Sequence, residues 1–284
     1  MPSSASVLDP RVAIVIATRN RSASLLDTLR HLVDGSGQAQ IVVVDNGSTD
    51  DSPAAVRTAF PTICVVELGE NRGAAGRTVG VAAVNTPYVA FSDDDSWWMP
   101  GALAHAADLL DGNSRLGLIA GSVVLGDDAR LDPACLEMAR SPLPARRSLP
   151  GRPVLGFIAC GAVVRREAYL AVCGFEPHFG VGGEEELLAL DLAGAGWDLA
   201  YVPAVIARHY PSAMRDPTQR NRVIVRNALW SAWLRRPFHR ALRNTAAAAR
   251  AAWHDPAHRA GVAEALRGLP WVARARRPIP STVE

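Results

Sequence analysis

Three consecutive carboxylates, Asp93, Asp94 and Asp95, are the residues of this 284-residue chain whose spacing points most directly to chemistry. They follow an apolar run at residues 88–91, which is typical of a short buried strand. Adjacent acids repel one another, and a divalent cation bound by oxygen ligands can compensate their charge. In an extended chain, Asp93 and Asp95 would point to one side and Asp94 to the other. We therefore expect a carboxylate pair that binds a metal ion carrying a diphosphate, with a solvated acidic turn as the alternative.

Strands that alternate with helices must position these acids. Four apolar runs read as strands: residues 12–17, 41–44, 63–66 and 88–91. Leucines at helical spacing predict a helix over residues 22–33, between the first two strands. This alternation is typical of a mainly parallel α/β sheet, which binds ligands beyond the carboxyl ends of its strands. Because Thr18, Asp45 and Asp93 all fall at such ends, we expect them to line one crevice.

Two later segments also bear on the site. Residues 127–153 contain five prolines and are predicted to form a long loop, which could cover the donor or acceptor. Residues 157–164 are predicted to form a strand that crosses near the site.

Absent motifs argue against several classes of protein. No GxGxxG follows the first strand, which argues against an ordinary dinucleotide-binding fold, and a chain without lysine cannot contain a P-loop. Residues 1–10 lack the basic start and apolar stretch of a signal peptide, and no run reaches the roughly 18 apolar residues of a spanning helix. We therefore expect a cytoplasmic protein whose four cysteines, which lack metal-site spacing, are reduced thiols.

Four stretches, in this order and spacing, carry a resemblance to a known family: residues 15–20 (VIATRN), 42–50 (VVVDNGSTD), 71–77 (NRGAAGR) and 93–95 (DDD). Together they resemble family 2 glycosyltransferases with the GT-A fold, and the acidic triplet fits the family's DxD motif. The similarity covers roughly residues 11–210. It implies a Rossmann-like, mainly parallel sheet flanked by helices, within a catalytic domain of residues 1–210. Residues 211–284 would form a basic, helical C-terminal region.

The resemblance also implies which residues bind the nucleotide-sugar donor: Thr18, Arg19, Asp45, Arg77, Asp93, Asp94 and Trp97. In the family, the acid at the position of Asp45 binds the nucleotide base, and a carboxylate suits the imide N–H of uracil or thymine. Arg77 matches the family's phosphate-side arginine, although Thr78 follows it where asparagine is usual. Trp97 could stack on a sugar or acceptor, or simply pack in the core.

Mg²⁺ or Mn²⁺ is the cofactor that the resemblance implies. Asp95 would ligate the metal directly, and Asp93 would contact both the metal and the ribose. In similar enzymes, a histidine near the position of His209 ligates the metal or contacts the diphosphate; a purely structural histidine is the alternative.

A run of three glutamates, Glu184, Glu185 and Glu186, provides the candidates for the catalytic base. The family has an acidic pair at the start of a helix here, and the second acid is its base. Glu184 matches the first acid and Glu185 the second, where aspartate is more usual. Glu186 is the competing candidate. The structural alternative is that glutamates simply favour a helix N-terminus.

These assignments predict an inverting glycosyltransferase that moves a sugar from a UDP- or dTDP-sugar to an acceptor hydroxyl or another nucleophile. The acceptor could be a glycan, a lipid-linked glycan or a small natural product. A nucleotidyltransferase, which would release pyrophosphate, is one alternative. A non-catalytic nucleotide-sugar-binding protein is another, although binding alone would not need the three glutamates. No nucleic-acid partner is expected.

The C-terminal stretch differs in charge from the rest of the chain. Up to Tyr210 there are 16 arginines and 24 acidic residues, a net charge of −8; from Pro211 onward there are 14 arginines and 4 acidic residues, a net charge of +10. Tryptophans are interleaved with these arginines. Such sign asymmetry suggests an anionic partner or membrane surface. We expect an amphipathic helical appendage that rests on the core, on a partner or on the inner face of an anionic membrane.

Overall fold

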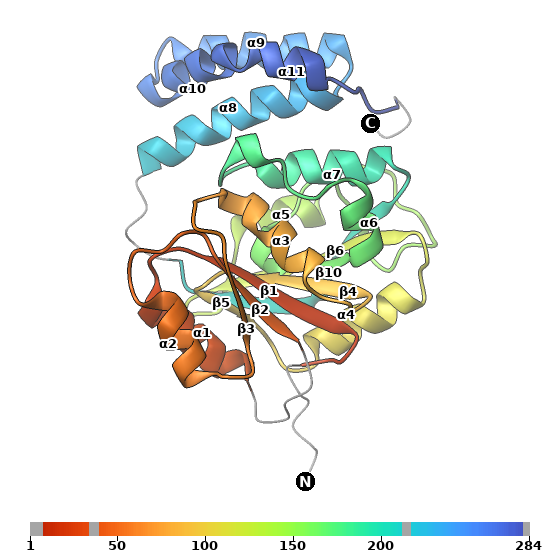
Figure 1. Ribbon diagram of the computed structural model, residues 1–284. Coiled ribbons are helices and arrows are strands. Elements are labelled where there is room, and N and C mark those ends of the chain that lie inside the picture. The colour runs from red at the N-terminus through yellow and green to blue at the C-terminus, as the bar shows by residue number, and fades with distance from the viewer. Residues whose placement is uncertain (1–7, 34–39, 212–216, 281–284) are drawn as a thin grey trace.

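The computed structural model describes residues 8–33, 40–211 and 217–280, which include a sheet covered by helices on both faces (Figure 1). The ten strands of the sheet are β1 (Val12–Thr18), β2 (Ile41–Asp45), β3 (Cys64–Glu67), β4 (Tyr88–Ser92), β5 (Ser96–Trp98), β6 (Leu116–Leu125), β7 (Arg130–Leu131), β8 (Arg152–Pro153), β9 (Ala162–Arg165) and β10 (Asp198–His209). The main path runs in the order β3-β2-β1-β4-β9-β6-β10-β5. The pairs β3–β2, β2–β1, β1–β4 and β6–β10 are parallel, and the others are antiparallel. The predicted mainly parallel α/β sheet is thereby confirmed.

Helices pack on the two faces of this sheet because its strands are apolar on both sides. One face is covered by α1 (Ser22–Leu32), α2 (Ser52–Ala59) and α4 (Ala102–Asp111), and the other by α3 (Gly76–Ala82), α5 (Pro133–Ala139), α6 (Arg166–Ala171) and α7 (Glu184–Gly194). Along β1, Val12, Ile14 and Ile16 join the first cluster, whereas Ala13 and Val15 join the second. Each fully buried Val or Ile contributes roughly 1.5–3 kcal/mol. A polar substitution in β1 would therefore destabilise the strand that leads into the site.

Two segments differ from their predicted structure. Residues 127–153 are not a loop throughout, since they contain β7, α5 and β8. Asp132 caps α5 by accepting a hydrogen bond from the Ala134 N–H at 2.9 Å, and Pro133 occupies the first turn. Residues 157–164 are not one strand either. A 3-10 turn, η2 (Ala159–Gly161), precedes β9, so Cys160 lies just before the strand begins.

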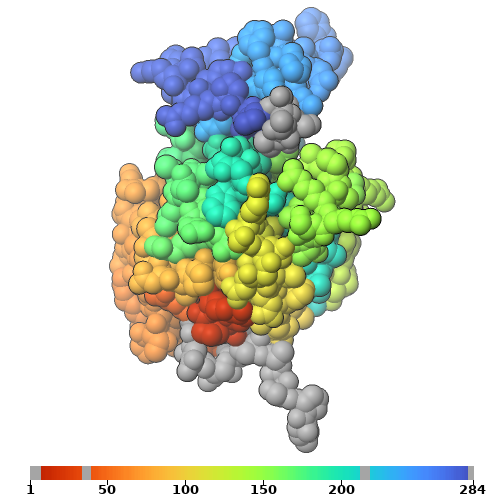
Figure 2. All heavy atoms as spheres, turned by 90° about the vertical axis from the view of Figure 1, so that its right-hand side faces the viewer, coloured from red at the N-terminus to blue at the C-terminus, as the bar shows by residue number. Residues whose placement is uncertain are grey.

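The C-terminal residues form a helical layer beyond α7: α8 (Pro217–Arg235), α9 (Phe238–Ala252), α10 (Pro256–Arg267) and α11 (Leu269–Ala275). This confirms the predicted helical C-terminal region, which caps one end of the molecule when seen from the side (Figure 2). An apolar cluster joins this layer to the part of the chain that contains the sheet, with Phe179 and Leu187 against Leu229 and Trp230. The tryptophans of α8 and α11 therefore belong to an internal interface. The domain boundary at residue 210 stays a prediction.

Charged and polar contacts reinforce this interface. Arg236, directly after α8, pairs with Glu186 of α7 at 2.8 Å. Arg235, the last residue of α8, pairs with Asp191 of α7. The side-chain amide of Asn227 is fully buried and donates to the backbone carbonyls of Phe179 and Gly182, at 3.0 and 2.7 Å. Because a buried carbonyl without a donor is costly, Asn227 fixes the loop that leads into α7.

Candidate active site

The acidic triplet forms a turn between β4 and β5. The Asp93 N–H donates to Ser96 Oγ at 2.7 Å, and the Ser96 N–H donates to the Asp93 carbonyl at 3.2 Å. These bonds bend the chain directly after Ser92. The alternation expected from an extended chain is therefore wrong, and the three carboxylates sort differently: Asp94 and Asp95 share one arginine, whereas Asp93 has another.

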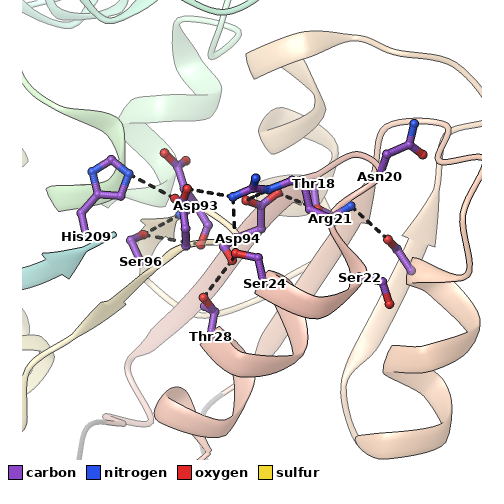
Figure 3. Close-up of polar contacts among 12 residues, drawn as sticks. Thr18, Asn20, Arg21, Ser22, Ser24, Thr28, Asp93, Asp94, Ser96 and His209 are labelled. Atoms are coloured by element: carbon purple, nitrogen blue, oxygen red, sulfur yellow. Dashed lines mark hydrogen bonds and ion pairs between the residues drawn. The ribbon is translucent and has the colours of Figure 1, made fainter. Parts of the chain in front are cut away.

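Two arginines compensate the charge of the triplet, and Figure 3 shows one of them, Arg21, beside Asp94. Arg21, at the start of α1, donates to Asp94 at 3.2 Å and to Asp95 at 3.1 Å. Arg77, at the start of α3, pairs with Asp93. Arg21 was not among the residues singled out from the sequence, although it lies in the loop that follows β1. Part of the charge compensation that we assigned to a metal ion thus comes from the protein itself.

Asp94 anchors the turn to α1 and β1. Thr18, the last residue of β1, donates its hydroxyl to Asp94 Oδ2 at 2.8 Å. The hydroxyls of Ser24 and Thr28 donate to the Asp94 carbonyl at 2.8 and 2.9 Å (Figure 3). Burial, followed by the charge of Asp95, raises the pKa of the Asp94 carboxyl against the hydrogen bond from Thr18. Hydrogen bonds from β1 and α1 thus fix both the side chain and the backbone of Asp94.

His209 brings the end of β10 to the acidic turn. Its Nε2 lies 3.1 Å from Asp95 Oδ1. One ligand atom each from Asp93, Cys160 and His209 lie within 4.8 Å of one another. This group holds one carboxylate, one thiol and one imidazole, and Asp95 joins it through its contact with His209. Carboxylates and an imidazole are donors that suit Mg²⁺ or Mn²⁺. The metal-binding role of Asp93, Asp95 and His209 stays a prediction.

Cys160 is a candidate ligand that the sequence did not reveal, because the four cysteines lack metal-site spacing. The 3-10 turn before β9 brings its side chain next to Asp93 and His209. The thiol is almost fully buried, and burial, followed by the charge of Asp93, raises its pKa well above the ordinary value. A thiol is a softer ligand than a carboxylate and favours metals such as Zn²⁺. Its presence bears on which metal the site selects.

A glycine-rich segment positions Arg77. The 3-10 turn η1 (Gly73–Ala75) leads directly into α3. A Cβ at Gly76 would lie only 2.7 Å from Asn46 Oδ1, so glycine leaves the room that the Asn46 side chain needs. Asn46 accepts from the Arg72 N–H and donates to the Gly73 carbonyl, both at 3.2 Å. The loop after β2 and the start of α3 are thus tied together beside the site.

Arg77 is a buried cation surrounded by carboxylates. Burial alone would lower its pKa, but the charges of Asp93, Glu184 and Glu185 outweigh burial and raise it. Its Nε has no hydrogen-bond partner among the described residues. A buried guanidinium with one unused donor is well suited to bind an anion, since its planar fork matches phosphate oxygens.

The three glutamates at the start of α7 point in different directions. Glu184 is buried and accepts a hydrogen bond from the Gly182 N–H. Glu184 and Glu185 both border the cavity that contains Arg77 and Asp93. Glu186 instead pairs with Arg236 of the C-terminal layer. Burial, followed by the charge of Glu184, raises the pKa of Glu185 to about 8. Burial also raises the pKa of Glu184.

A cavity of about 330 Å³ brings together most of the predicted residues: Thr18, Arg19, Arg77, Asp93, Asp94, Glu184, Glu185 and His209. Arg220, from the first turns of the C-terminal layer, also lines it. The cavity lies beyond the carboxyl ends of β1, β4 and β10, as expected for a parallel sheet. An anionic ligand in this cavity would meet Arg19, Arg77 and Arg220.

Asp45 lies beside this cavity, at the end of β2. Its Oδ2 accepts from the Ser48 N–H at 2.9 Å, which shapes the turn after the strand. Its Oδ1 is buried and has no hydrogen-bond partner among the described residues. Asn20 ties this turn to the loop after β1, because its Oδ1 accepts from the Thr49 N–H at 2.7 Å. Asp45 thus keeps one acceptor atom unused.

Trp97 does not line the cavity of Glu185. Its ring is stacked between His31, with centroids 3.9 Å apart, and Tyr210, with centroids 5.1 Å apart. Both faces of the indole are therefore covered, and neither can stack on a sugar while these contacts last. Trp97 borders a second cavity of about 610 Å³, together with Asp95 and Arg208.

Comparisons with known proteins agree with this geometry. The model of the family described as "Glycosyl transferase family 2" matches residues 13–172. The succinoglycan biosynthesis protein ExoU of Rhizobium meliloti is 33% identical over 96 residues, which are 32% of this chain and 28% of that protein. The N-acetylglucosaminyl-diphospho-decaprenol L-rhamnosyltransferase of Mycobacterium tuberculosis is 26% identical over 212 residues, which are 62% of this chain and 69% of that protein.

A solved structure shares the fold over nearly the whole chain. The mannosyltransferase PcManGT from Pyrobaculum calidifontis, in complex with GDP-Man and Mn²⁺, matches with a TM-score of 0.63 at 21% identity. The match covers 96% of this chain and 86% of that structure.

Proposed function

Because this chain belongs to glycosyl transferase family 2 and has the GT-A fold, we propose that it is an inverting glycosyltransferase. It would move a sugar from a nucleotide-diphosphate donor to an acceptor hydroxyl or another nucleophile. The observation that carries this proposal is the placement of Glu185 in one cavity with the buried Arg77 and Asp93. A base, a phosphate-binding cation and a metal-binding carboxylate are the three groups that the reaction needs.

Glu185 is the proposed base. An acceptor hydroxyl is a poor nucleophile until its proton is removed in the transition state, and a carboxylate within reach can take that proton. A carboxyl whose pKa is raised to about 8 is a stronger base, once ionised, than an ordinary glutamate. Glu184 would orient the first turn of α7 through its bond to the Gly182 N–H. The pairing of Glu186 with Arg236 argues against this role for Glu186.

A divalent cation would be held by Asp93, Asp95 and His209, where it would neutralise charge on the departing diphosphate. Arg77 would bind the same diphosphate through the donor that the protein leaves unused. Arg19 lines the cavity from the opposite loop and is exposed. Together these side chains would orient the donor so that its anomeric carbon faces Glu185.

The donor would be a UDP- or dTDP-sugar, recognised through Asp45. The imide N–H of uracil or thymine needs an acceptor, and Asp45 Oδ1 is an acceptor without a partner among the described residues. Guanine would also present N–H donors, and the Pyrobaculum structure contains GDP-Man. The donor screen below therefore compares nucleotide sugars with different bases. The proposed acceptor is a glycan, a lipid-linked glycan or a small natural product. We place the enzyme in the cytoplasm, where nucleotide sugars are made.

A donor screen tests the reaction. The purified chain is mixed with UDP-, dTDP- and GDP-sugars and candidate acceptors, with and without Mn²⁺, and released nucleoside diphosphate is measured. Glu185→Gln should lower the transfer rate by about 10²–10⁴-fold while donor affinity stays near that of the unchanged protein. Glu186→Gln is the matched control, since it removes a neighbouring carboxylate that faces α8, and it should keep the rate within a few-fold.

Three results would contradict the proposal. Release of pyrophosphate from a nucleoside triphosphate would indicate a nucleotidyltransferase. Donor binding without any turnover would indicate a binding protein. A product with the donor's anomeric configuration, seen by NMR, would exclude inversion.

A further inference from the structure

Helix α9 exposes an apolar stripe that no described part of the chain covers. Phe238, Leu242 and Trp253 are 63%, 52% and 80% exposed. Ala246 and Ala249 lie between them and are also exposed. At about 100° of rotation per residue, these five side chains fall within about 80° of the helix circumference. The stripe is continuous along the whole helix, whereas scattered single exposed apolar residues would need no explanation.

The face of α9 beside the stripe, on the side away from Arg243 and Arg250, packs inside the molecule. Ala241 and Ala252 are buried there. Thr245 accepts a hydrogen bond from the Trp233 indole N–H at 2.9 Å, and the Phe238 ring meets Trp233 edge to face with centroids 5.6 Å apart. Of the stripe, only Phe238 takes part in these contacts. The stripe therefore widens the apolar side of α9 beyond what the packing of the layer uses.

Positive charge adjoins the stripe on one side. Arg243 and Arg250 lie on the neighbouring face of the helix, and both are exposed. Neither pairs with an acidic residue in the part of the chain that the structure describes. They belong to the stretch after residue 210, whose net charge is +10 against −8 for the rest of the chain. An apolar stripe bordered by unpaired arginines is complementary to a surface whose outer layer is anionic and whose deeper layer is apolar.

We propose that α9 docks flat on a bilayer that contains anionic phospholipids. Phe238, Leu242 and Trp253 would enter the boundary between headgroups and acyl chains, while Arg243 and Arg250 would bind the phosphates. Within the described residues, no helix is both long and apolar enough to cross a membrane. The attachment is therefore peripheral and reversible, and it weakens as salt screens the arginines. It does not depend on the enzymatic function proposed above.

Vesicle sedimentation of the full chain tests this surface. The probes are phosphatidylcholine vesicles with and without phosphatidylglycerol, at low and high salt. The unchanged protein should bind the anionic vesicles at low salt and lose most of that binding at high salt. Phe238→Ser with Trp253→Ser, and separately Arg243→Glu with Arg250→Glu, should each lower the partition coefficient by about tenfold or more.

Two control variants keep the test specific. Leu136→Ser removes an exposed apolar side chain from α5, which is 47% exposed, and Arg147→Glu reverses an exposed arginine outside the C-terminal layer. Both should bind vesicles as the unchanged protein does. Far-ultraviolet circular dichroism should be the same for all variants, because the changed side chains are exposed. Only the variant that changes Phe238 should melt at a slightly lower temperature, because it loses the ring contact with Trp233.

Three outcomes would overturn the proposal. One is the absence of binding to anionic vesicles at low salt. Another is undiminished binding of the two double variants. The third is a lipid-free dimer that Phe238→Ser with Trp253→Ser converts to a monomer, since the stripe would then belong to a second copy of the chain.

Discussion

Replacing Glu185 by glutamine should make the fold more stable at high pH, although it should abolish transfer. In the folded chain, burial and then the charge of Glu184 raise the pKa of Glu185 from its ordinary 4.5 to about 8. Between these two values, the folded state holds a proton that the unfolded state has lost. The free energy of unfolding therefore falls as pH rises from about 5 to 8, and this loss is complete above pH 8. Glutamine carries no charge, so the variant escapes the loss.

The magnitude follows from the same values. At about 1.4 kcal/mol for each pKa unit, a rise from 4.5 to about 8 corresponds to at most about 5 kcal/mol. Partial solvation of the carboxylate would reduce this figure. We therefore expect Glu185→Gln to gain a few kcal/mol relative to the unchanged protein between pH 5 and pH 9, a large part of the stability of an ordinary domain.

Urea unfolding of the metal-free chain, followed by circular dichroism from pH 5 to pH 9, measures this difference. Glu186→Gln is the control, because it removes the pairing with Arg236 and should be less stable than the unchanged protein at pH 9. If Glu185→Gln and the unchanged protein keep a constant difference over the whole range, the carboxyl of Glu185 is not in the environment described here.

Three further predictions concern the donor and metal sites. Asp45→Ala should weaken UDP binding, since a hydrogen bond to a charged group contributes roughly 1.5–3 kcal/mol; calorimetry showing unchanged affinity would exclude the base contact. Asp95→Ala removes a carboxylate 3.1 Å from His209 and should abolish Mn²⁺-dependent turnover; full activity in the presence of a chelator would refute its metal role. Because Cys160 lies with Asp93 and His209, Co²⁺ bound to the unchanged chain should show a near-ultraviolet thiolate absorption band that Cys160→Ser lacks. Identical spectra would show that the thiol is only a neighbour of the site.

The central strands could be predicted because they are buried on both faces and therefore read as unbroken apolar runs. The same pattern predicts the loops at their carboxyl ends, and with them the positions of Thr18, Asp45 and Asp93. Arg77 was singled out by the family resemblance instead. Residues 127–153 were wrongly predicted to be a loop because they contain five prolines. Asp132 followed by Pro133 is nevertheless typical of a helix start, and α5 begins there.

The remaining parts of the site depend on distant packing. Nothing local shows that Arg21 reaches across to Asp94 and Asp95, because that contact requires α1 to lie against the β4–β5 turn. Neighbouring helix positions point about 100° apart, so Glu185 and Glu186 must face different ways. Only the position of Arg236 indicates which of them faces away from the cavity. The approach of Cys160 to the site depends on the turn before β9. The stacking that covers Trp97 depends on His31, which is distant in the sequence.

The buried amide of Asn227 has a consequence for how freely this enzyme can be divided or recombined. A chain cut after residue 210 would lose the donor to the carbonyls of Phe179 and Gly182 and would expose Phe179 and Leu187 to water. The loop that leads into α7 would then lose the hydrogen bonds that fix it, and the first turn of α7, which carries the proposed base, would no longer be held in place. The terminal helices thus help to position the proposed base and are not an exchangeable module. Replacing them with the C-terminal helices of another protein should lower turnover before it affects other properties.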